Sequence, residues 1–250
     1  MQLEVCIDNI ESLHNAIAGG ATRIELCSSL ALGGLTPSYG FMQQAGKLST
    51  VPIYAMIRPR QGDFFYSEQE IETMRIDIKA AKQAGLHGVV FGVLTQDGHV
   101  HIPFTRTLCK LAQQLGLGVT FHRAFDQCCN AQTALEEIIQ LGCERVLTSG
   151  LAPSAYQGVA QIKALVKQAN SRVSVMAGAG INAENVGQLI RSTQVKEIHL
   201  SGKIERPSKM IFIAEQSKMG ADDVDDFSIP VTSRDRIAQV SSAITRNDDS

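Results

Sequence analysis

The sequence predicts a single (β/α)8 barrel, also called a TIM barrel, in one domain spanning residues 1–250. Short apolar segments alternate with amphipathic helical segments along the chain, and this alternation is typical of a parallel sheet covered by helices. The apolar segments number eight, and eight parallel strands close a barrel. The length of 250 residues is also typical of one barrel. A doubly wound open sheet is the alternative.

The expected elements alternate regularly up to about residue 201, and Gly-containing turns separate the helices from the strands that follow. Glycine just past a helix end supplies the left-handed cap, as in Gln83-Ala84-Gly85. Strands are expected near 2–6, 22–26, 52–57, 87–91, 117–121, 145–148, 173–176 and 196–200. Helices are expected near 9–18, 38–47, 67–84, 104–115, 130–141, 154–169 and 182–191, with an eighth near 233–245.

Segment 202–228 breaks this alternation. It is polar, contains Pro207 and ends in the acidic cluster 222–226. Long stretches without secondary structure in a compact domain are usually functional or disordered loops, so we expect an irregular segment before the last helix. The acidic cluster is interpreted as a solvated surface, with a divalent-ion site as the alternative.

The composition indicates a globular protein without a nucleic-acid or membrane partner. Apolar residues make up 44% of the chain, charged residues make up 19%, and the net charge is −2, so no basic stripe or cationic membrane helix is expected. No apolar segment has the length of a membrane span. The N-terminal residues lack a secretory signal pattern. We therefore expect a cytoplasmic protein whose six cysteines are thiols or ligands rather than disulfides.

The strongest chemical signal is a motif that occurs on the first two predicted strands. Leu3-Glu4-Val5-Cys6 matches Ile24-Glu25-Leu26-Cys27, and the strand period places each glutamate on the same face as the following cysteine. A carboxylate buried against apolar helices is costly, so this face is expected to point into the barrel near its mouth. Cys6 and Cys27 are then expected at one level on neighbouring strands, where two thiols can bind one soft metal ion. The alternative is that both cysteines are small core residues.

Ionisable residues gather at the carboxyl ends of other predicted strands, where catalytic residues lie in barrels of this class. His122 and His199, together with Glu4 and Glu25, are candidates for acid–base catalysis. The alternative for each histidine is a structural hydrogen bond to a barrel carboxylate. The candidate residues for binding a ligand or anion follow strands three, five, seven and eight and are Arg58, Arg60, Arg123, Asp126, Gly178, Gly180 and Ser201.

The glycines after strand seven would let a phosphate approach the backbone at the position where barrels often bind one. A tight turn that needs glycine for conformational reasons is the alternative. Two further patterns are weaker. Cys128-Cys129 precede a helix and are interpreted as incidental thiols, with a reactive pair as the alternative. His99 and His101 form an H-x-H pair that is interpreted as part of an exposed turn rather than a metal site.

Together these segments resemble the copper homeostasis protein CutC family over nearly the whole chain, to about residue 220. The matches are Leu-Glu-Val-Cys at 3–6, Arg-Ile-Glu-Leu-Cys at 23–27, Gly-Gly-Leu-Thr-Pro-Ser at 33–38, Met-Ile-Arg-Pro-Arg at 56–60, Gly-Asp-Phe at 62–64, Val-Val-Phe-Gly-Val-Leu at 89–94, Thr-Phe-His-Arg-Ala-Phe-Asp at 120–126, Leu-Thr-Ser-Gly at 147–150 and Gly-Ala-Gly-Ile at 178–181. Residues 209–213 depart from the family, because apolar side chains stand where relatives carry basic ones, and this argues against anion binding by that loop.

The resemblance implies a (β/α)8 fold, a cytoplasmic location, a homodimer or higher homo-oligomer, and a role in copper homeostasis with Cu(I) bound by Cys6 and Cys27. The residues themselves favour a second hypothesis, an enzyme that acts on a small anionic or phosphorylated metabolite, because a two-coordinate copper site needs no arginines or histidines. An oligomeric scaffold that has lost its activity is the third. The expected ligand is thus a metal ion or a small anion, and no motif indicates an organic cofactor.

Overall fold

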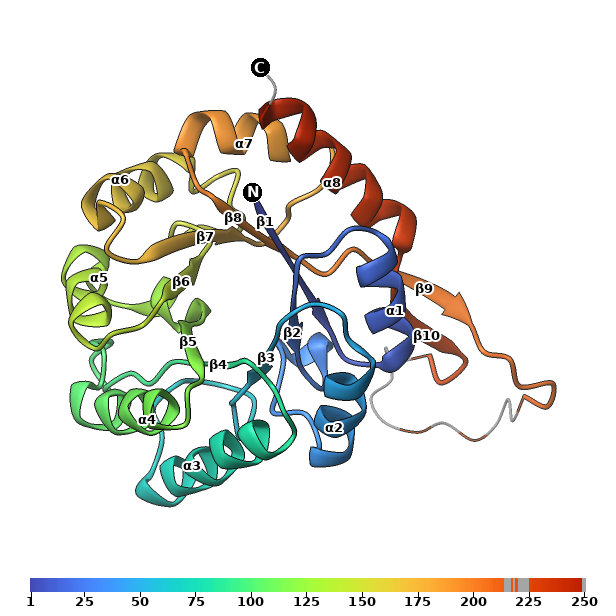
Figure 1. The fold of residues 1–250 in the computed structure, drawn as a ribbon, viewed down its shortest axis with the longest axis horizontal. Coiled ribbons are helices and arrows are strands. Elements are labelled where there is room, and N and C mark those ends of the chain that lie inside the picture. The colour runs from blue at the N-terminus through green and yellow to red at the C-terminus, as the bar shows by residue number, and fades with distance from the viewer. Residues whose placement is uncertain (214–216, 218, 220–224, 249–250) are drawn as a thin grey trace.

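The computed structural model describes residues 1–213, 217, 219 and 225–248, and its dominant feature is a closed parallel barrel (Figure 1). Within these residues eight strands follow one another around the barrel in chain order, and β8 pairs with β1 to close it. The predicted (β/α)8 barrel is confirmed, and the open-sheet alternative is wrong. The barrel strands are β1 (Gln2–Ile7), β2 (Arg23–Leu26), β3 (Ile53–Met56), β4 (Gly88–Phe91), β5 (Gly118–Phe121), β6 (Arg145–Thr148), β7 (Ser174–Gly178) and β8 (Glu197–Leu200).

Helices surround the barrel and connect successive strands (Figure 1). Local signals set their ends: α3 begins at a capping box in which Ser67 and Glu70 each bond the other's backbone N–H. Gly85, with φ +79°, follows the C-cap of the same helix. The helices are α1 (Ile10–Ala18), α2 (Tyr39–Leu48), α3 (Glu68–Gln83), α4 (Ile102–Gln114), α5 (Ala131–Gln140), α6 (Val159–Ala169), α7 (Val186–Thr193) and α8 (Arg234–Asp248), with the 3-10 turns η1 (Leu30–Leu32) and η2 (Arg123–Gln127).

The strands separate an apolar shell from a charged barrel interior. Leu3, Val5 and Ile7 of β1 are buried in the main hydrophobic core that the helices share. Glu4 and Cys6 alternate with them and face inward, as the sequence predicted. Buried charges are tolerated only when they are paired, so the interior must supply partners for Glu4, and it does so from β2 and β8.

Segment 202–228 is more regular than the sequence predicted. β9 (Lys203–Pro207) pairs antiparallel with β10 (Ser228–Thr232), and the two strands project beside α1 (Figure 1). The backbone N–H of Thr232 donates to the Ser12 hydroxyl at 2.9 Å, which ties β10 to α1. The expectation of an irregular segment missed these two strands, because β10 begins some twenty residues after β9, beyond the reach of local periodicity. Residues 208–213 between them contain no helix or strand, as expected.

The loop between β9 and β10 begins with the apolar residues for which the sequence predicts a departure from the resembled family. Met210, Ile211, Phe212 and Ile213 are all exposed. Residues 222–224 of the acidic cluster lie outside the described residues, and the Asp225 carboxylate accepts the Phe227 N–H at 2.9 Å within a turn. No helix in the described part of the chain is long and apolar enough to cross a membrane.

Candidate functional site

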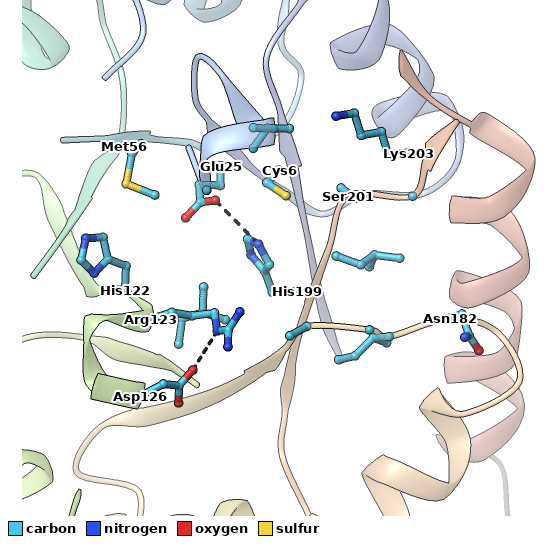
Figure 2. Close-up of a pocket in the computed structure, with 18 of the residues that line it drawn as sticks. Cys6, Glu25, Met56, His122, Arg123, Asp126, Asn182, His199, Ser201 and Lys203 are labelled. Atoms are coloured by element: carbon cyan, nitrogen blue, oxygen red, sulfur yellow. Dashed lines mark hydrogen bonds and ion pairs between the residues drawn. The ribbon is translucent and has the colours of Figure 1, made fainter. Parts of the chain in front are cut away.

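A cavity of about 1020 Å³ opens at the carboxyl ends of the barrel strands. Residues from strands and loops throughout the barrel line it, including Cys6 of β1, Glu25 of β2, His199 of β8 and the loops after β5, β6 and β7 (Figure 2). Its size is in the range of small-molecule sites. The cavity therefore lies where the sequence predicted a ligand site.

Three buried side chains converge on the wall of this cavity. One ligand atom each of Cys6, Glu25 and His199 lies within 4.8 Å of the other two. The strand order explains the meeting: β1 lies between β2 and β8, its Cys6 is the register partner of Glu25, and its Glu4 is the register partner of His199. Barrel closure thus brings residues nearly 200 positions apart in the chain into one cluster.

A chain of ion pairs below the cluster fixes the orientation of His199. Nδ1 of His199 lies 2.8 Å from Oε1 of Glu4, and Arg23 donates to both Glu4 and Glu197. Arg145 Nε lies 3.1 Å from the Glu197 carboxylate. Burial opposes ionisation of Glu4, but the His199 hydrogen bond and the Arg23 charge outweigh it and lower the Glu4 pKa to about 2. Glu4 is therefore a fixed anion that holds His199 Nδ1.

Glu25 has the opposite environment from Glu4, although both carboxylates approach the same imidazole. Its Oε2 lies 3.7 Å from His199 Nε2, and its buried Oε1 has no hydrogen-bond partner among the described residues. Burial raises the pKa of Glu25, against the influence of His199. Burial by itself lowers the pKa of His199, yet Cys6, Glu25 and Glu4 together raise it well above its ordinary value. Two neighbouring carboxylates whose environments shift their pKa values in opposite directions are typical of acid–base sites.

His122 lines the same cavity as a neutral hydrogen-bond donor (Figure 2). Its Nδ1 accepts the Ala124 N–H at 3.1 Å, so the neutral ring carries its proton on Nε2. That buried Nε2 has no partner within the described chain. Burial and the Arg58 charge lower the His122 pKa to about 3. The site thus holds one neutral donor and one histidine whose environment favours the charged form.

The residues predicted to bind a ligand or anion fall into two groups. Some line the cavity, and the others support the structure around it. Arg58 lines the cavity, but its guanidinium donates to the carbonyls of Leu32, Gly34 and Gly62 and holds these loops together. Arg60 differs from the prediction that it lies at the ligand site. It pairs with Asp63 and Glu70 and is absent from the described cavity lining. The carboxylate of Glu70, which also caps α3, binds the Arg60 guanidinium, so Arg60 is not placed to hold a ligand.

Arg123 and Asp126 line the cavity as a bonded pair, with Arg123 Nε 2.7 Å from Asp126 (Figure 2). Asp126 also accepts the backbone N–H groups of Ser149 and Leu151, so it anchors the loop after β6. Arg123 is 44% exposed, and its outer face remains accessible to a ligand. The Asp126 carboxylate thus lies in the cavity wall and also holds the loop after β6 in place.

The glycines after β7 have different roles. Gly180, with φ +71°, and Ser201 line the cavity. Gly178 is absent from the described lining, and a Cβ there would lie 2.7 Å from Leu147 Cδ1. Gly178 thus allows close packing against Leu147, and because it lies in β7 without a positive φ it does not match the tight-turn alternative.

Cys27 occupies a different position from Cys6. It is fully buried with Tyr54 and Met56 and is absent from the described cavity lining. Its Sγ lies 3.6 Å from Glu25 Oε2. The expectation that Cys6 and Cys27 share one level is wrong, because strand register pairs Cys6 with Glu25 instead.

The sequence analysis did not identify several residues that line or support the cavity. Lys203 and Arg236 line the cavity, and the position of Lys203 directly after Ser201-Gly202 was a usable signal. Because side chains alternate along a strand, Arg23 lies on the same face as Glu25, and Glu197 lies on the same face as His199. The interior location of Arg23 and Glu197 could therefore have been predicted from the sequence. Arg236 lies in the first turn of α8, and nothing in the local sequence indicates that it reaches the mouth.

A closed parallel barrel with ionisable side chains around a cavity at the carboxyl ends of its strands defines a TIM-barrel protein. The chain belongs to the CutC family: the family model matches residues 1–204. It is 75% identical over 243 residues to the CutC family protein of Vibrio campbellii, covering 97% of this chain and 98% of that one. The corresponding protein of Vibrio cholerae is 63% identical over 243 residues, covering 97% of this chain and 96% of that one.

Solved structures agree with the fold. The CutC structure from Streptococcus agalactiae matches with a TM-score of 0.76 and 33% identity, over 80% of this chain and 98% of that one. A thiamine phosphate pyrophosphorylase from Pyrococcus furiosus matches with a TM-score of 0.60 at 15% identity, over 98% of this chain and 96% of that one. This second likeness concerns the fold alone.

The neutral state of His122 predicts an acid-sensitive fold. Because its folded pKa of about 3 lies below the unfolded value of about 6.5, its contribution to stability is complete above pH 6.5. It is lost as pH falls from about 6.5 towards 3. In nitrogen-15 NMR, the His122 ring is expected to remain the neutral Nε2–H tautomer from about pH 8 to 5, a range in which an ordinary histidine titrates. His122→Gln identifies the signal, and a midpoint near pH 6.5 would contradict the assignment.

Proposed function

We propose that this protein is a cytoplasmic copper homeostasis protein that binds Cu(I) at the barrel mouth through Cys6 and Cys27. The main support for this proposal is the position of Cys6, whose thiol faces the cavity beside the imidazole of His199. Thiolates are the protein ligands that Cu(I) favours. The Streptococcus agalactiae relative is described as a copper homeostasis protein, which supports the same role here.

The residues present fit Cu(I) as a bound cargo. Burial is the largest cause of the raised Cys27 pKa, and the charges of Glu25 and then of Cys6 add to it, so the two thiol sites interact. Cu(I) must displace the Cys27 proton, so the affinity for Cu(I) is expected to rise with pH.

Assembly into a homodimer or higher homo-oligomer forms part of this proposal, and light scattering of the purified protein measures it.

Anaerobic titration of the reduced protein against a Cu(I) chelator tests the copper site. Wild type is expected to bind one Cu(I) tightly, and Cys6→Ser with Cys27→Ser is expected to lower the affinity by more than about 100-fold. Removing two thiolate ligands is expected to lower the affinity more than removing an outer-shell partner, which lowers it about 10–100-fold. Cys129→Ser is the matched control, because Cys129 is exposed and absent from the described cavity lining. Equal affinities of wild type and double variant would refute the copper site.

A second candidate function is an enzyme that acts on a small anionic or phosphorylated metabolite. It is favoured by the partnerless Nε2–H of His122 and the partnerless Oε1 of Glu25, since buried polar atoms are normally satisfied. In this proposal Glu25 and His199 transfer protons, His122 donates to the substrate, and Arg123 holds the anion. Glu4 positions His199. An inactive scaffold is less well supported, because it has no need for so costly a charged interior.

Orthophosphate binding measured by calorimetry tests the anion site. Arg123→Gln and Lys203→Gln are each expected to weaken binding about 10-fold, because a hydrogen bond to a charged group contributes about 1.5 kcal/mol or more. Arg106→Gln serves as control, since Arg106 is exposed on α4 outside the described cavity lining. Binding too weak to measure in wild type, or unchanged in both variants, would count against the enzyme proposal.

A further inference from the structure

We propose that Cys6, Glu25 and His199 form a three-ligand site for a divalent ion of Zn(II) type, with the fourth coordination position open to the cavity. This inference does not rest on Cu(I) binding. It concerns a different ion, a different donor set and a ligand, His199, that a two-thiol copper site does not include. Zinc sites with three protein ligands and one open position are the catalytic kind, whereas structural zinc sites are closed by four protein ligands.

The separations of the donor atoms suit one small ion. Zinc bonds of about 2.0–2.3 Å at tetrahedral angles place ligand atoms about 3.3–3.8 Å apart. Glu25 Oε2 and His199 Nε2 are 3.7 Å apart, and the Cys6 thiol lies within 4.8 Å of both. Only a small movement of the Cys6 side chain is needed, since one rotatable bond carries its sulfur.

The partners of His199 match those of a metal-ligating histidine. Its Nδ1 is held by Glu4 at 2.8 Å, which leaves Nε2 as the ring nitrogen on the side of Glu25. Metal-bound histidines almost always donate their second ring N–H to a carboxylate or carbonyl, which fixes the tautomer and ring orientation. Arg23 in turn holds Glu4. The outer shell is therefore already assembled, and Glu4 is a positioning residue.

Glu25 supplies an independent observation. Its carboxylate is 4% exposed, and its Oε1 has no hydrogen-bond partner in the described part of the chain. A divalent ion bound by one thiolate, one carboxylate and one neutral imidazole forms a neutral group, which removes the cost of burying the carboxylate. Cu(I) does not serve this purpose, because carboxylates suit harder ions than Cu(I).

The open position faces a ligand space. Cys6, Glu25 and His199 all line the cavity, and His122 and Arg123 line it with them (Figure 2). Water or an oxygen atom of a small anionic ligand can take the fourth position, and the charge of Arg123 favours an anion there. The site thus has the parts of a centre that polarises or activates a bound oxygen atom.

Cobalt(II) is the probe for this centre, because a cobalt–thiolate bond adds near-ultraviolet charge-transfer absorption and four-coordinate cobalt has intense visible bands. The reduced, metal-free full chain is titrated anaerobically with Co(II) and then back-titrated with Zn(II). Wild type is expected to show one equivalent of thiolate-bound, four-coordinate cobalt that Zn(II) displaces. Cys6→Ser is expected to lose the charge-transfer band, and Glu25→Gln and His199→Gln are expected to lose high-affinity binding. Cys129→Ser is the matched control and keeps the wild-type spectrum.

Two further variants separate this centre from the copper site and from general damage to the fold. Cys27→Ser is expected to retain the cobalt spectrum even where it loses tight Cu(I) binding. Glu4→Gln is expected to keep the thiolate band but bind cobalt about 10–100-fold more weakly, as an outer-shell change does. Circular dichroism checks that each variant folds, and the wild-type titration stands even if one does not. A wild-type spectrum without a thiolate band, or a band lost in Cys27→Ser but kept in Cys6→Ser, would overturn the proposal.

Discussion

Buried ion pairs inside the barrel hold the candidate site in place. They run from Arg145 through Glu197 and Arg23 to Glu4, and Glu4 bonds the imidazole of His199. Removing one partner of a buried pair typically costs about 3–5 kcal/mol, because the other charge is left uncompensated. The orientation of His199 at the mouth therefore depends on charges that lie deeper in the barrel and are absent from the described cavity lining.

The same column of charges explains how two similar carboxylates come to differ. Glu4 receives hydrogen bonds from both Arg23 and His199 and has a depressed pKa, whereas Glu25 lies above it with one oxygen unpaired in the described structure and a raised pKa. Environment, not residue type, decides which carboxylate remains a fixed anion. The lower glutamate orients the histidine, and the upper one is available to a proton or to a metal ion.

The functional proposals use one group of residues for different ligands. Copper homeostasis draws on the thiols and on family membership, while the enzyme and divalent-ion proposals draw on Glu25, His199 and the cavity they line. A soft two-thiol site gives no role to the carboxylate or to the His122 donor. These polar atoms, partnerless among the described residues, are the reason to look for a ligand in addition to Cu(I).

The sequence by itself determined the barrel, the order of its elements and the inward face of the doubled Glu-x-Cys motif. Those features follow from hydrophobic periods and glycine turns, which depend on neighbours a few residues away. It also placed His122, His199 and Arg123 at the mouth, because strand ends are visible in the pattern. Only the tertiary structure decided that Cys6 lies beside Glu25 and His199, and that Arg60 pairs with Glu70. Register between strands and the pairing of β1 with β8 arise from packing around the whole barrel, and no local stretch of sequence contains that information.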